Sequence, residues 1–394
     1  MSNPPAQPAV VVAGHICLDL IPSFPNEKVA LVPGTLVQIG ASTFATGGVS
    51  NTAVALTRLG VPTTFIGKVG DDQFGSLVRK TLQNQSELLA RGLVVAPGEI
   101  TSYTYVISPP GVDRMFLHCP GANDTFNDAD VPYNALLPAK IFHFGYPPLM
   151  AGIRANRGAA LTSLLKQVKQ KGLITSLDLT YPDPASEAGR TDWRTILTNA
   201  ASHLDIFLPS IEEILQMLDR PKFDAIMQSQ GQIDIARDID LNTVASLASE
   251  LLNMGVRIVG IKLGNQGIYL RTTSDASRLT NITKDPAWVN RELLSPCFKV
   301  NVVGTTGSGD ATIAGFLAAV LRGESPEDAL ISATAVGACC CEKADSTSGV
   351  VAWDQISDRI HQGWPQHDLR MSHEGWKKKD PIWIGPQDAA PGPP

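Results

Sequence analysis

Residues 304–310, GTTGSGD, place three glycines and one carboxylate directly before the uncharged run ATIAGFLAAVL. The apolar run FKVNVVG (298–304) leads into them and is typical of a strand, so we expect a glycine loop between a strand and a buried helix. Glycines permit a sharp turn, and they let a ligand approach the first amides of a helix, which lack partners inside the helix and attract anions. The backbone of Gly307, Ser308 and Gly309 is therefore suited to binding a phosphate.

The carboxylate of Asp310 admits two interpretations. It could cap the helix, or it could act as a general base that takes a proton from a hydroxyl attacking a bound phosphoryl group. Spacing excludes two other phosphate-binding loops. The stretch lacks the lysine of the Walker pattern G-x-x-x-x-G-K-S/T, and it is not the G-x-G-x-x-G of a dinucleotide-binding loop, which would follow the first strand.

A second glycine-rich stretch, TGGVSNTAVALTRLG (46–60), has the same build. Gly47 and Gly48 come just before a helical pattern, which is also what an ordinary tight turn would require. Asn51 lies near the start of that helix, and Asp19 interrupts an apolar strand upstream, so both could hydrogen-bond a polyol. A buried carboxylate without partners is costly, so Asp19 must find them among ligand hydroxyls or backbone amides.

Short β-branched runs alternate with helical patterns along most of the chain. Seven runs are typical of strands: 9–14, 63–70, 140–146, 173–179, 205–210, 257–264 and 298–304. Helical spacing of apolar residues occurs between them, at 51–60, 74–83, 161–172, 211–218 and 243–255. The alternation predicts the α/β class, with a mostly parallel central sheet that carries helices on both faces.

One region breaks the alternation. TSYTYVISPPGVDRMFLHC (101–119) holds two strand-like runs about a Pro-Pro-Gly turn, a hairpin signal. We expect a single domain over 1–364, with a small β-sheet lid built from about 15–45 and 100–120. Residues 365–394 are expected to form an irregular, proline-rich C-terminal extension, although the two tryptophans of GWKKKDPIWIG could dock it on the body.

Composition excludes several classes of protein. A net charge of −6 argues against nucleic acid or an anionic membrane as the main partner. No uncharged apolar run approaches the ~20 residues needed to span a bilayer, and the N-terminus lacks the regions of a signal peptide. The six cysteines have no zinc or disulfide spacing. We therefore expect a cytoplasmic protein with cysteines as small buried side chains.

Taken together, these stretches resemble the ribokinase (PfkB) family of carbohydrate and nucleoside kinases. The resemblance covers roughly residues 9–355 and rests on seven blocks in family order: G-x-I-x-x-D (14–19), TGGVSNTAVALTRLG (46–60), IGKVGDDQFG (66–75), PGAN (120–123), S-I-E-E (210–213), KLGNQG (262–267) and GTTGSGDA (304–311). Any one block is weak evidence, but several in order are specific. The resemblance implies a ribokinase-like fold with a β-sheet lid, and phosphoryl transfer from ATP to a small alcohol.

The resemblance also implies roles for individual residues. Asp310 matches the catalytic base, and Gly307, Ser308 and Gly309 match the backbone anion hole. Glu213 matches the acidic end of an Asn-x-x-Glu element that organises Mg2+, largely through water. The remaining matches are Ser210, Lys262, Gly264, Gly267 and Thr305 at the nucleotide site, and Asp19, Gly47, Gly48, Asn51 and Asn123 at the acceptor site.

The chain departs from the family pattern at several positions. Thr46 stands where the first of the paired glycines usually is, and Cys17 replaces an asparagine near the acceptor. Ser210 replaces the asparagine of Asn-x-x-Glu, which weakens the magnesium assignment. Gly304 replaces an aspartate that helps some members bind a monovalent cation, so activation by K+ is left open. DLTYPDP (178–184) lacks the asparagine and arginine that often contact a charged acceptor.

The leading hypothesis is an ATP-dependent sugar kinase acting on a hydroxyl, primary in most of the family, of a neutral monosaccharide or related polyol. The acceptor region is poor in Lys and Arg, and Arg114 could reach an acceptor or be a solvated charge of the hairpin turn. Two alternatives stay open: a nucleoside kinase of the same family and a non-catalytic sugar- or nucleotide-binding protein. The first could hold a base with aromatic residues, namely Tyr103, Tyr105, Phe116 and Phe142. The lid could also pair two copies in a homodimer.

Overall fold

The computed structural model describes residues 7–24, 33–109, 115–230 and 235–389. Ten strands among them form one sheet, in the order β15-β16-β14-β13-β12-β11-β10-β9-β1-β4. Their bounds are β1 Val10–Gly14, β4 Thr63–Ile66, β9 Ile141–Gly145, β10 Ile174–Leu177, β11 Ile206–Phe207, β12 Ile258–Lys262, β13 Ile268–Thr272, β14 Glu292–Ser295, β15 Lys377–Lys379 and β16 Ile382–Ile384. Neighbours from β4 to β12 pair in parallel, and the pairs from β12 to β15 are antiparallel.

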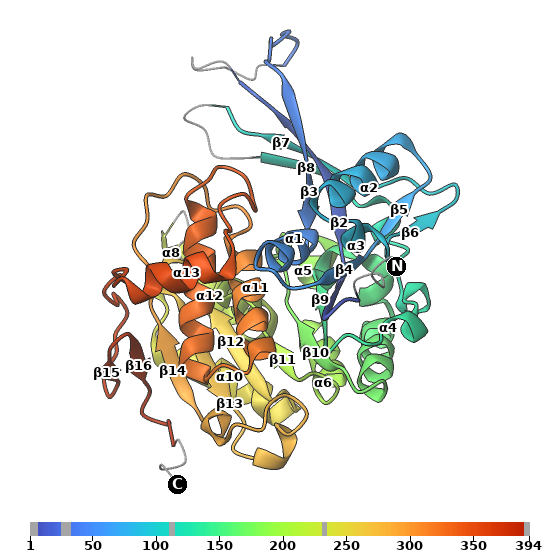
Figure 1. The fold of residues 1–394 in the computed structure, drawn as a ribbon. Coiled ribbons are helices and arrows are strands. Elements are labelled where there is room, and N and C mark those ends of the chain that lie inside the picture. The colour runs from blue at the N-terminus through green and yellow to red at the C-terminus, as the bar shows by residue number, and fades with distance from the viewer. Residues whose placement is uncertain (1–6, 25–32, 110–114, 231–234, 390–394) are drawn as a thin grey trace.

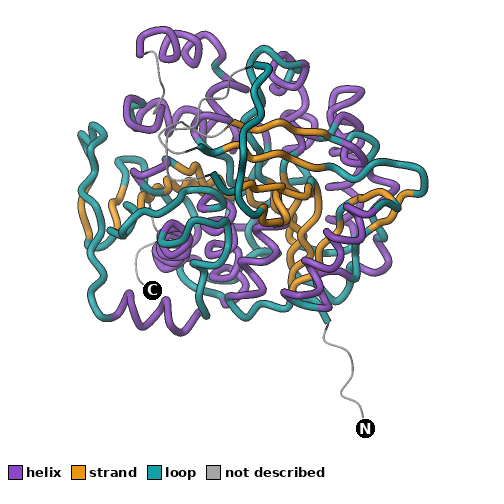
Figure 2. The backbone as a smooth tube through the Cα atoms, turned by 90° about the horizontal axis from the view of Figure 1, so that it is seen from above, coloured by secondary structure: helices purple, strands orange, loops and turns teal. Residues whose placement is uncertain are grey.

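Successive residues of the strands enter two different cores, because side chains alternate across a sheet. Val10 and Val12 of β1 belong to one apolar cluster, and Val11 and Ala13 to the other. Figure 2 shows the strands running between helices on either side. The helices are α1 Ser50–Arg58, α2 Gln73–Gln85, α3 Glu87–Ala90, α4 Ala151–Gln170, α5 Glu187–Arg190, α6 Trp193–Ala201, α7 Ile211–Leu218, α8 Arg220–Gln230, α9 Ile235–Asp238, α10 Leu241–Met254, α11 Ser308–Arg322, α12 Pro326–Cys341 and α13 Trp353–His361.

The two faces of the sheet are covered by different sets of helices. Buried residues of α1, α2, α3, α11, α12 and α13 lie in the first cluster, and those of α4, α6, α7 and α10 lie in the second. The expected α/β fold, with helices on both faces of a mostly parallel sheet, is thus confirmed. None of the helices in the described ranges is long and apolar enough to cross a membrane.

A separate four-stranded sheet, which we call the lid, projects from the body (Figure 1). Its order is β3-β2-β7-β8, with β2 Ile16–Pro22, β3 Ser42–Gly48, β7 Tyr103–Ile107 and β8 Met115–Cys119. Asp19, Thr104 and His118 are cross-strand neighbours and so share one face, while Leu20, Tyr105 and Leu117 share the other. The expected lid and its hairpin are confirmed. Arg114 lies outside the described residues.

Two expectations about strands were wrong. Residues 298–304 form no strand and make one isolated bridge, between Phe298 and Gln366. Their alternating apolar pattern reflects an extended segment whose side chains Phe298, Val300 and Val302 line a cavity. Residues 63–70, expected as one strand, divide into β4 and β5 (Lys68–Gly70), and β5 pairs with β6 (Val94–Ala96) in a small sheet of its own.

The C-terminal extension, expected to be irregular, contains a hairpin. β15 and β16 form a hairpin that extends the central sheet, because β16 pairs with β14 through Leu293↔Ile384 and Leu294↔Trp383. All three residues of β15 are exposed lysines, so this stretch lacks the apolar residues by which a strand is predicted from sequence. The tryptophan-containing segment is docked on the body, because Trp376 and Trp383 pack against the second apolar cluster.

Candidate active site

The carboxyl ends of the parallel strands bring polar side chains to one edge of the sheet. His15 follows β1, Tyr146 follows β9, Asp178 follows β10, and Lys262 ends β12. Ser210 follows β11 and forms a bridge with Lys262. Ligands of open α/β sheets bind at the carboxyl ends of the strands, so the topology alone predicts a functional site at this edge.

Asp310 lies at this edge, in the first turn of α11, and is only 4% exposed. Its carboxylate accepts hydrogen bonds from Asn51 Nδ2 at 3.2 Å and Thr52 Oγ1 at 3.3 Å. Burial, followed by the negative charge of Asp178, raises the pKa of Asp310 to about 7. A carboxyl group that titrates near neutrality is suited to accepting a proton at physiological pH.

Tyr146 makes the other contact to this carboxylate. Its hydroxyl is 3.1 Å from Asp310 Oδ1 and 3.3 Å from Oδ2. Burial and the neighbouring carboxylates, Asp310 first, raise the pKa of Tyr146 well above its usual value, so the hydroxyl stays a donor. The residue is held in a left-handed conformation, φ 62°. Sequence reasoning missed it, although a non-glycine residue held in this region is a frequent mark of a functional site.

The glycine loop leads into α11 as the sequence predicts, although no strand precedes it. Gly307 is the N-cap of α11 with φ 76°, and a Cβ there would lie 2.3 Å from the carbonyl oxygen of Ser346. Ser346 also donates to Asn51 Oδ1 at 3.0 Å, so the segment around it connects the glycine loop to α1. The first amides of α11, at Ser308 and Gly309, therefore lie next to Asp310 in a backbone geometry that only glycine at 307 allows.

Lys262 brings positive charge to the same place. Its Nζ would be 3.9 Å from a Cβ built on Gly309, and its charge lowers the pKa of both Asp310 and Glu213. Glu213 is buried, and burial raises its pKa to about 7 despite Lys262 and the Ser210 amide. Ser210 and Glu213 form a capping box at the start of α7, with Ser210 N donating to Glu213 Oε2 at 2.7 Å. Serine thus fulfils the capping role at this position.

A cavity of about 320 Å³ begins at these groups. Ser210, Lys262, Thr305, Ser308 and Gly309 line its polar end, close to Asp310. The rest of its wall is mostly apolar and comes from the 264–267 turn, the 297–302 segment and α12. The predicted nucleotide-site residues lining it are Ser210, Lys262, Gly264, Gly267 and Thr305. The cavity has the character of a ligand site, with apolar walls and a few polar groups at one end.

Asp19 lies in lid strand β2, which begins directly after His15 at this edge of the central sheet. Its carboxylate accepts from Cys17 Sγ at 3.3 Å and is packed so closely on Gly47 that a Cβ there would lie 2.4 Å from Oδ2. Burial raises the pKa of Asp19 to about 6. In the structure Asp19 therefore has two side-chain partners, the Cys17 thiol and the Thr104 hydroxyl, and no backbone amide is among its partners in the described residues.

Two other predicted acceptor residues have different surroundings. Asn123 is fully buried. Its side-chain oxygen accepts from Ile16 N at 3.1 Å, and its Nδ2 donates to Ile16 O at 2.9 Å. It thereby fixes the start of β2 against the turn at 121–123. Gly48, with φ 74°, is packed on His15, where a Cβ would lie 2.5 Å from Nδ1. Burial, followed by His118, lowers the pKa of His15 to about 3, so this imidazole is neutral.

Asp178 is a second residue that sequence reasoning missed. It is 1% exposed, and its Oδ1 has no hydrogen bond although His143 Nε2 lies 3.5 Å away. Its charge raises the pKa of Asp310 and of Glu213. A carboxylate directly after a buried parallel strand was the available signal. Three carboxyl groups, those of Asp178, Glu213 and Asp310, therefore lie close enough to influence one another, with Lys262 acting on the last two, an excess of negative charge that suits a cation.

The comparisons with known proteins identify the family of this arrangement. The family model described as "pfkB family carbohydrate kinase" matches residues 7–353. Among curated proteins, "Probable fructokinase-6, chloroplastic" of Arabidopsis thaliana is 28% identical over 343 residues, covering 84% of this chain and 77% of that protein. "Fructokinase-1" of Oryza sativa subsp. japonica is 25% identical over 348 residues, covering 85% of this chain and 92% of that protein.

Solved structures show the same fold. The ribokinase of Thermotoga maritima matches with a TM-score of 0.64 at 20% identity, over 90% of this chain and 99% of that chain. The fructokinase of Xylella fastidiosa, solved with bound ATP, matches with a TM-score of 0.67 at 17% identity, over 90% of this chain and 98% of that chain.

Proposed function

Because the chain belongs to the PfkB family of carbohydrate kinases, we propose that it transfers the γ-phosphate of ATP to a hydroxyl of a small neutral monosaccharide or related polyol. The observation that carries the proposal is the placement of Asp310. Its neighbours Ser308 and Gly309 line the cavity, and its carboxylate accepts hydrogen bonds from Asn51 and Thr52 of α1, the helix that follows lid strand β3. Its pKa is raised to about 7.

The cavity supports ATP as the phosphoryl donor. Its polar end offers the Ser308 and Gly309 amides and the Lys262 ammonium, which can hold phosphates, and its apolar walls can hold a base. The Xylella fastidiosa fructokinase of the same fold was solved with ATP. In this chain, the triphosphate would lie along the loop of 304–310 with its γ-phosphate next to Asp310.

Magnesium fits the charges of the site. The charge of Asp178 raises the pKa of Asp310 and of Glu213, all three carboxylates raise that of Tyr146, and the charge of Lys262 lowers the pKa of Asp310 and Glu213. Within the described ranges no three His, Cys, Asp or Glu side chains are arranged to hold an ion directly. Mg2+ would therefore be held by ATP phosphates and water, with Glu213 as an outer contact, and it would neutralise charge on the phosphates.

The chain's own residues would carry the transfer as follows. The acceptor hydroxyl approaches Asp310, whose carboxylate is oriented by Asn51, Thr52 and Tyr146, and gives up its proton as its oxygen attacks the γ-phosphorus. The first amides of α11 and Lys262 stabilise the negative charge that spreads over the transferring group. The lid would cover the acceptor and exclude water, which protects ATP from hydrolysis.

The acceptor side favours an uncharged polyol. Asp19 is its central ionisable group, flanked by Cys17, Thr104 and His118, and burial lowers the pKa of His118. A carboxylate accepts hydrogen bonds from sugar hydroxyls and would repel an acceptor that carries a phosphate. A neutral monosaccharide, phosphorylated at a primary hydroxyl that can reach Asp310, fits these groups.

The alternatives draw less support. Of the four aromatic side chains considered for a nucleoside base, Phe142 is fully buried in β9, and Tyr103 and Tyr105 face away from Asp19 across the lid sheet. Only Phe116 among these four shares the lid face of Asp19. A non-catalytic binding protein would have no need of the three hydrogen-bond donors that orient Asp310.

The proposal extends to a homodimer through the lid. The face opposite Asp19 exposes Phe44, Tyr105 and Leu117, which are 49, 46 and 58% exposed. Adjacent exposed apolar side chains are typical of an association surface. Analytical ultracentrifugation of the protein and of a Leu117→Lys variant tests this: the dimer should dissociate in the variant, and a monomeric parent protein would refute it.

Release of ADP from Mg-ATP across a panel of monosaccharides, sugar acids, polyols and nucleosides tests the function, with and without K+. We expect acceptor-dependent turnover with neutral sugars. Turnover confined to nucleosides would support the nucleoside kinase instead. ADP binding without turnover on any member of a broad panel would support the non-catalytic protein.

A further inference from the structure

The segment directly after α13, residues 362–371, lies beyond the family match at 7–353 and lines the cavity assigned to the nucleotide at His367. We propose that this segment is part of the nucleotide site, and that His367 lies against the base of the bound nucleotide. The proposal rests on the function given above, because it assumes that the cavity holds ATP. It assigns nucleotide binding to a segment that the family match does not include.

Backbone hydrogen bonds tie the segment to one wall of the cavity. Lys299 N donates to Pro365 O at 2.8 Å, and His367 N donates to Cys297 O at 2.9 Å. The indole Nε1 of Trp364 adds a bond to Lys299 O at 2.8 Å. The segment therefore pairs with residues 297–299 much as a strand would, and this pairing fixes the backbone of His367 whatever its side chain.

A second attachment reaches another part of the cavity wall, the 264–267 turn. Arg370 N donates to Gln266 Oε1 at 3.0 Å, and Gln266 is buried in the turn that contains Gly264. Cys297 Sγ also lies 3.4 Å from Gly264 O. The segment thus bridges the 297–299 wall and the 264–267 turn, both of which line the cavity.

The position of His367 shows which end of the cavity it lines. The phosphate end is set by Lys262, Ser308 and Gly309, which lie beside Asp310. His367 is attached to Cys297, next to Phe298, in the apolar part of the wall. An apolar end next to a phosphate-binding end is where the flat, uncharged base of a nucleotide belongs, so His367 lies at the base end.

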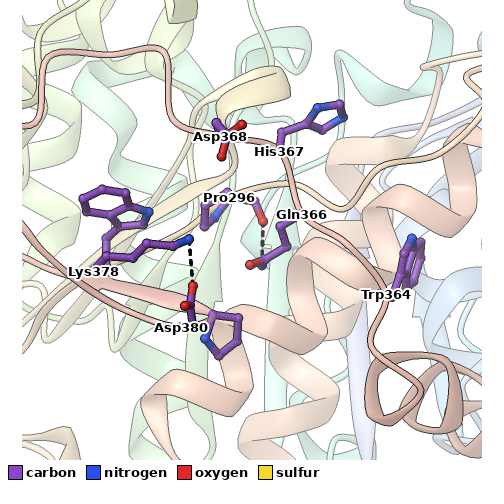
Figure 3. Close-up of a pocket in the computed structure, with 9 residues that line it drawn as sticks. Pro296, Trp364, Gln366, His367, Asp368, Lys378 and Asp380 are labelled. Atoms are coloured by element: carbon purple, nitrogen blue, oxygen red, sulfur yellow. Dashed lines mark hydrogen bonds and ion pairs between the residues drawn. The ribbon is translucent and has the colours of Figure 1, made fainter.

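The imidazole of His367 is free to contact a ligand. His367 also lines a neighbouring cavity of about 230 Å³, bounded by Pro296, Gln366 and the β15–β16 hairpin (Figure 3). No hydrogen bond of its ring is found in the part of the chain that the structure describes. Burial, Lys299 and Arg370 lower its pKa, so the ring is neutral at pH 7.5 and can stack on a base.

Calorimetric binding of ADP and of tripolyphosphate tests the proposal. Tripolyphosphate is the probe without a base and is measured by competition against ADP. The variants are His367→Ala, His367→Phe and, as a matched control, His361→Ala, which alters an exposed histidine at the end of α13 that lines neither cavity. We expect His367→Ala to weaken ADP binding about three- to tenfold, the range of one aromatic contact, and to leave tripolyphosphate binding unchanged. Since a phenyl ring can stack in the same way, His367→Phe should restore most of the ADP affinity.

Two results would overturn the proposal. One is an ADP affinity of His367→Ala within twofold of the parent protein and of His361→Ala. The other is an equal loss of ADP and tripolyphosphate binding, which would mean that the substitution disturbs the wall and removes no base contact. Absence of ADP binding to the parent protein would instead refute the nucleotide cavity itself, and with it the proposed function.

Discussion

Replacing Tyr146 by phenylalanine removes one hydroxyl that donates to both oxygens of Asp310, at 3.1 and 3.3 Å. This bond favours the charged carboxylate, and burial opposes it. Without the hydroxyl, the pKa of Asp310 should rise further above its value of about 7, because the buried charge loses a donor.

The size of the effect follows from the energy of the bond. A hydrogen bond to a charged group contributes about 1.5–3 kcal/mol, and one pKa unit corresponds to about 1.4 kcal/mol, so the shift is about one to two units. The pKa of Asp310 would then be about 8–9. A general base must be deprotonated, so at pH 7 the active fraction falls from about half to between about a tenth and a hundredth.

The assay is the pH dependence of kcat/KM for the acceptor at saturating Mg-ATP, for the parent protein and Tyr146→Phe. The acid limb of the profile should move to higher pH by one to two units, with a roughly 5- to 50-fold loss at pH 7 that is recovered by about pH 10. Tyr269→Phe is the matched control, since Tyr269 is also buried and donates to a buried carboxylate, Glu292, at 2.8 Å, outside the site.

An acid limb that stays in place, or one that moves to lower pH, would refute the reasoning. The first result would mean that Tyr146 does not stabilise the carboxylate in the reacting complex. A loss of activity that is constant across pH would assign Tyr146 a packing role, as would an equal change in Tyr269→Phe.

Three further predictions concern the loop and its carboxyl groups. Gly307→Ala should lower the free energy of unfolding, measured in urea, by about 2–4 kcal/mol, because the residue has φ 76° and the added Cβ meets Ser346 O. The control Gly323→Ala, with the same φ but no atom within 4 Å, should lower it by about 1 kcal/mol. Equal losses in the two variants would contradict the role of the Ser346 contact. Glu213→Gln should raise the Mg2+ concentration for half-maximal activity about tenfold and leave the acceptor KM unchanged; an unchanged Mg2+ requirement would remove Glu213 from the metal site. Asp310→Asn should be more stable to heat than the parent protein at pH 8. The pKa of Asp310 is about 7 in the folded state and 3.8 in the unfolded chain, so the parent protein loses up to about 4 kcal/mol of unfolding free energy as pH rises from 4 to 7. The difference in stability between the two proteins should vanish near pH 4.

Much of the architecture could be predicted from the sequence because it follows from local periodicity. The strands of the parallel sheet are short β-branched runs, and their alternating side chains supply the two cores, as at Val10 and Val11. Glycine motifs were equally readable, because φ 76° at Gly307 and φ 74° at Gly48 are backbone requirements that leave a mark in the sequence.

What the sequence did not disclose depends on contacts between distant segments. Tyr146 and Asp178 each follow a buried strand, but only the order of the strands in the sheet brings them next to Asp310. β15 is a run of lysines whose strand conformation depends on its pairing with β16. Conversely, residues 298–304 have the alternation of a strand but serve as a cavity wall beside His367, because β16 occupies the place next to β14.

The most direct test of the account is single-turnover transfer from radiolabelled ATP to an accepted sugar by Asp310→Asn, with ADP affinity measured on the same protein. If Asp310 is the general base, transfer should fall by about 10²- to 10⁴-fold while ADP binds as in the parent protein. Transfer at the parental rate would contradict the central claim that this carboxylate takes the acceptor's proton.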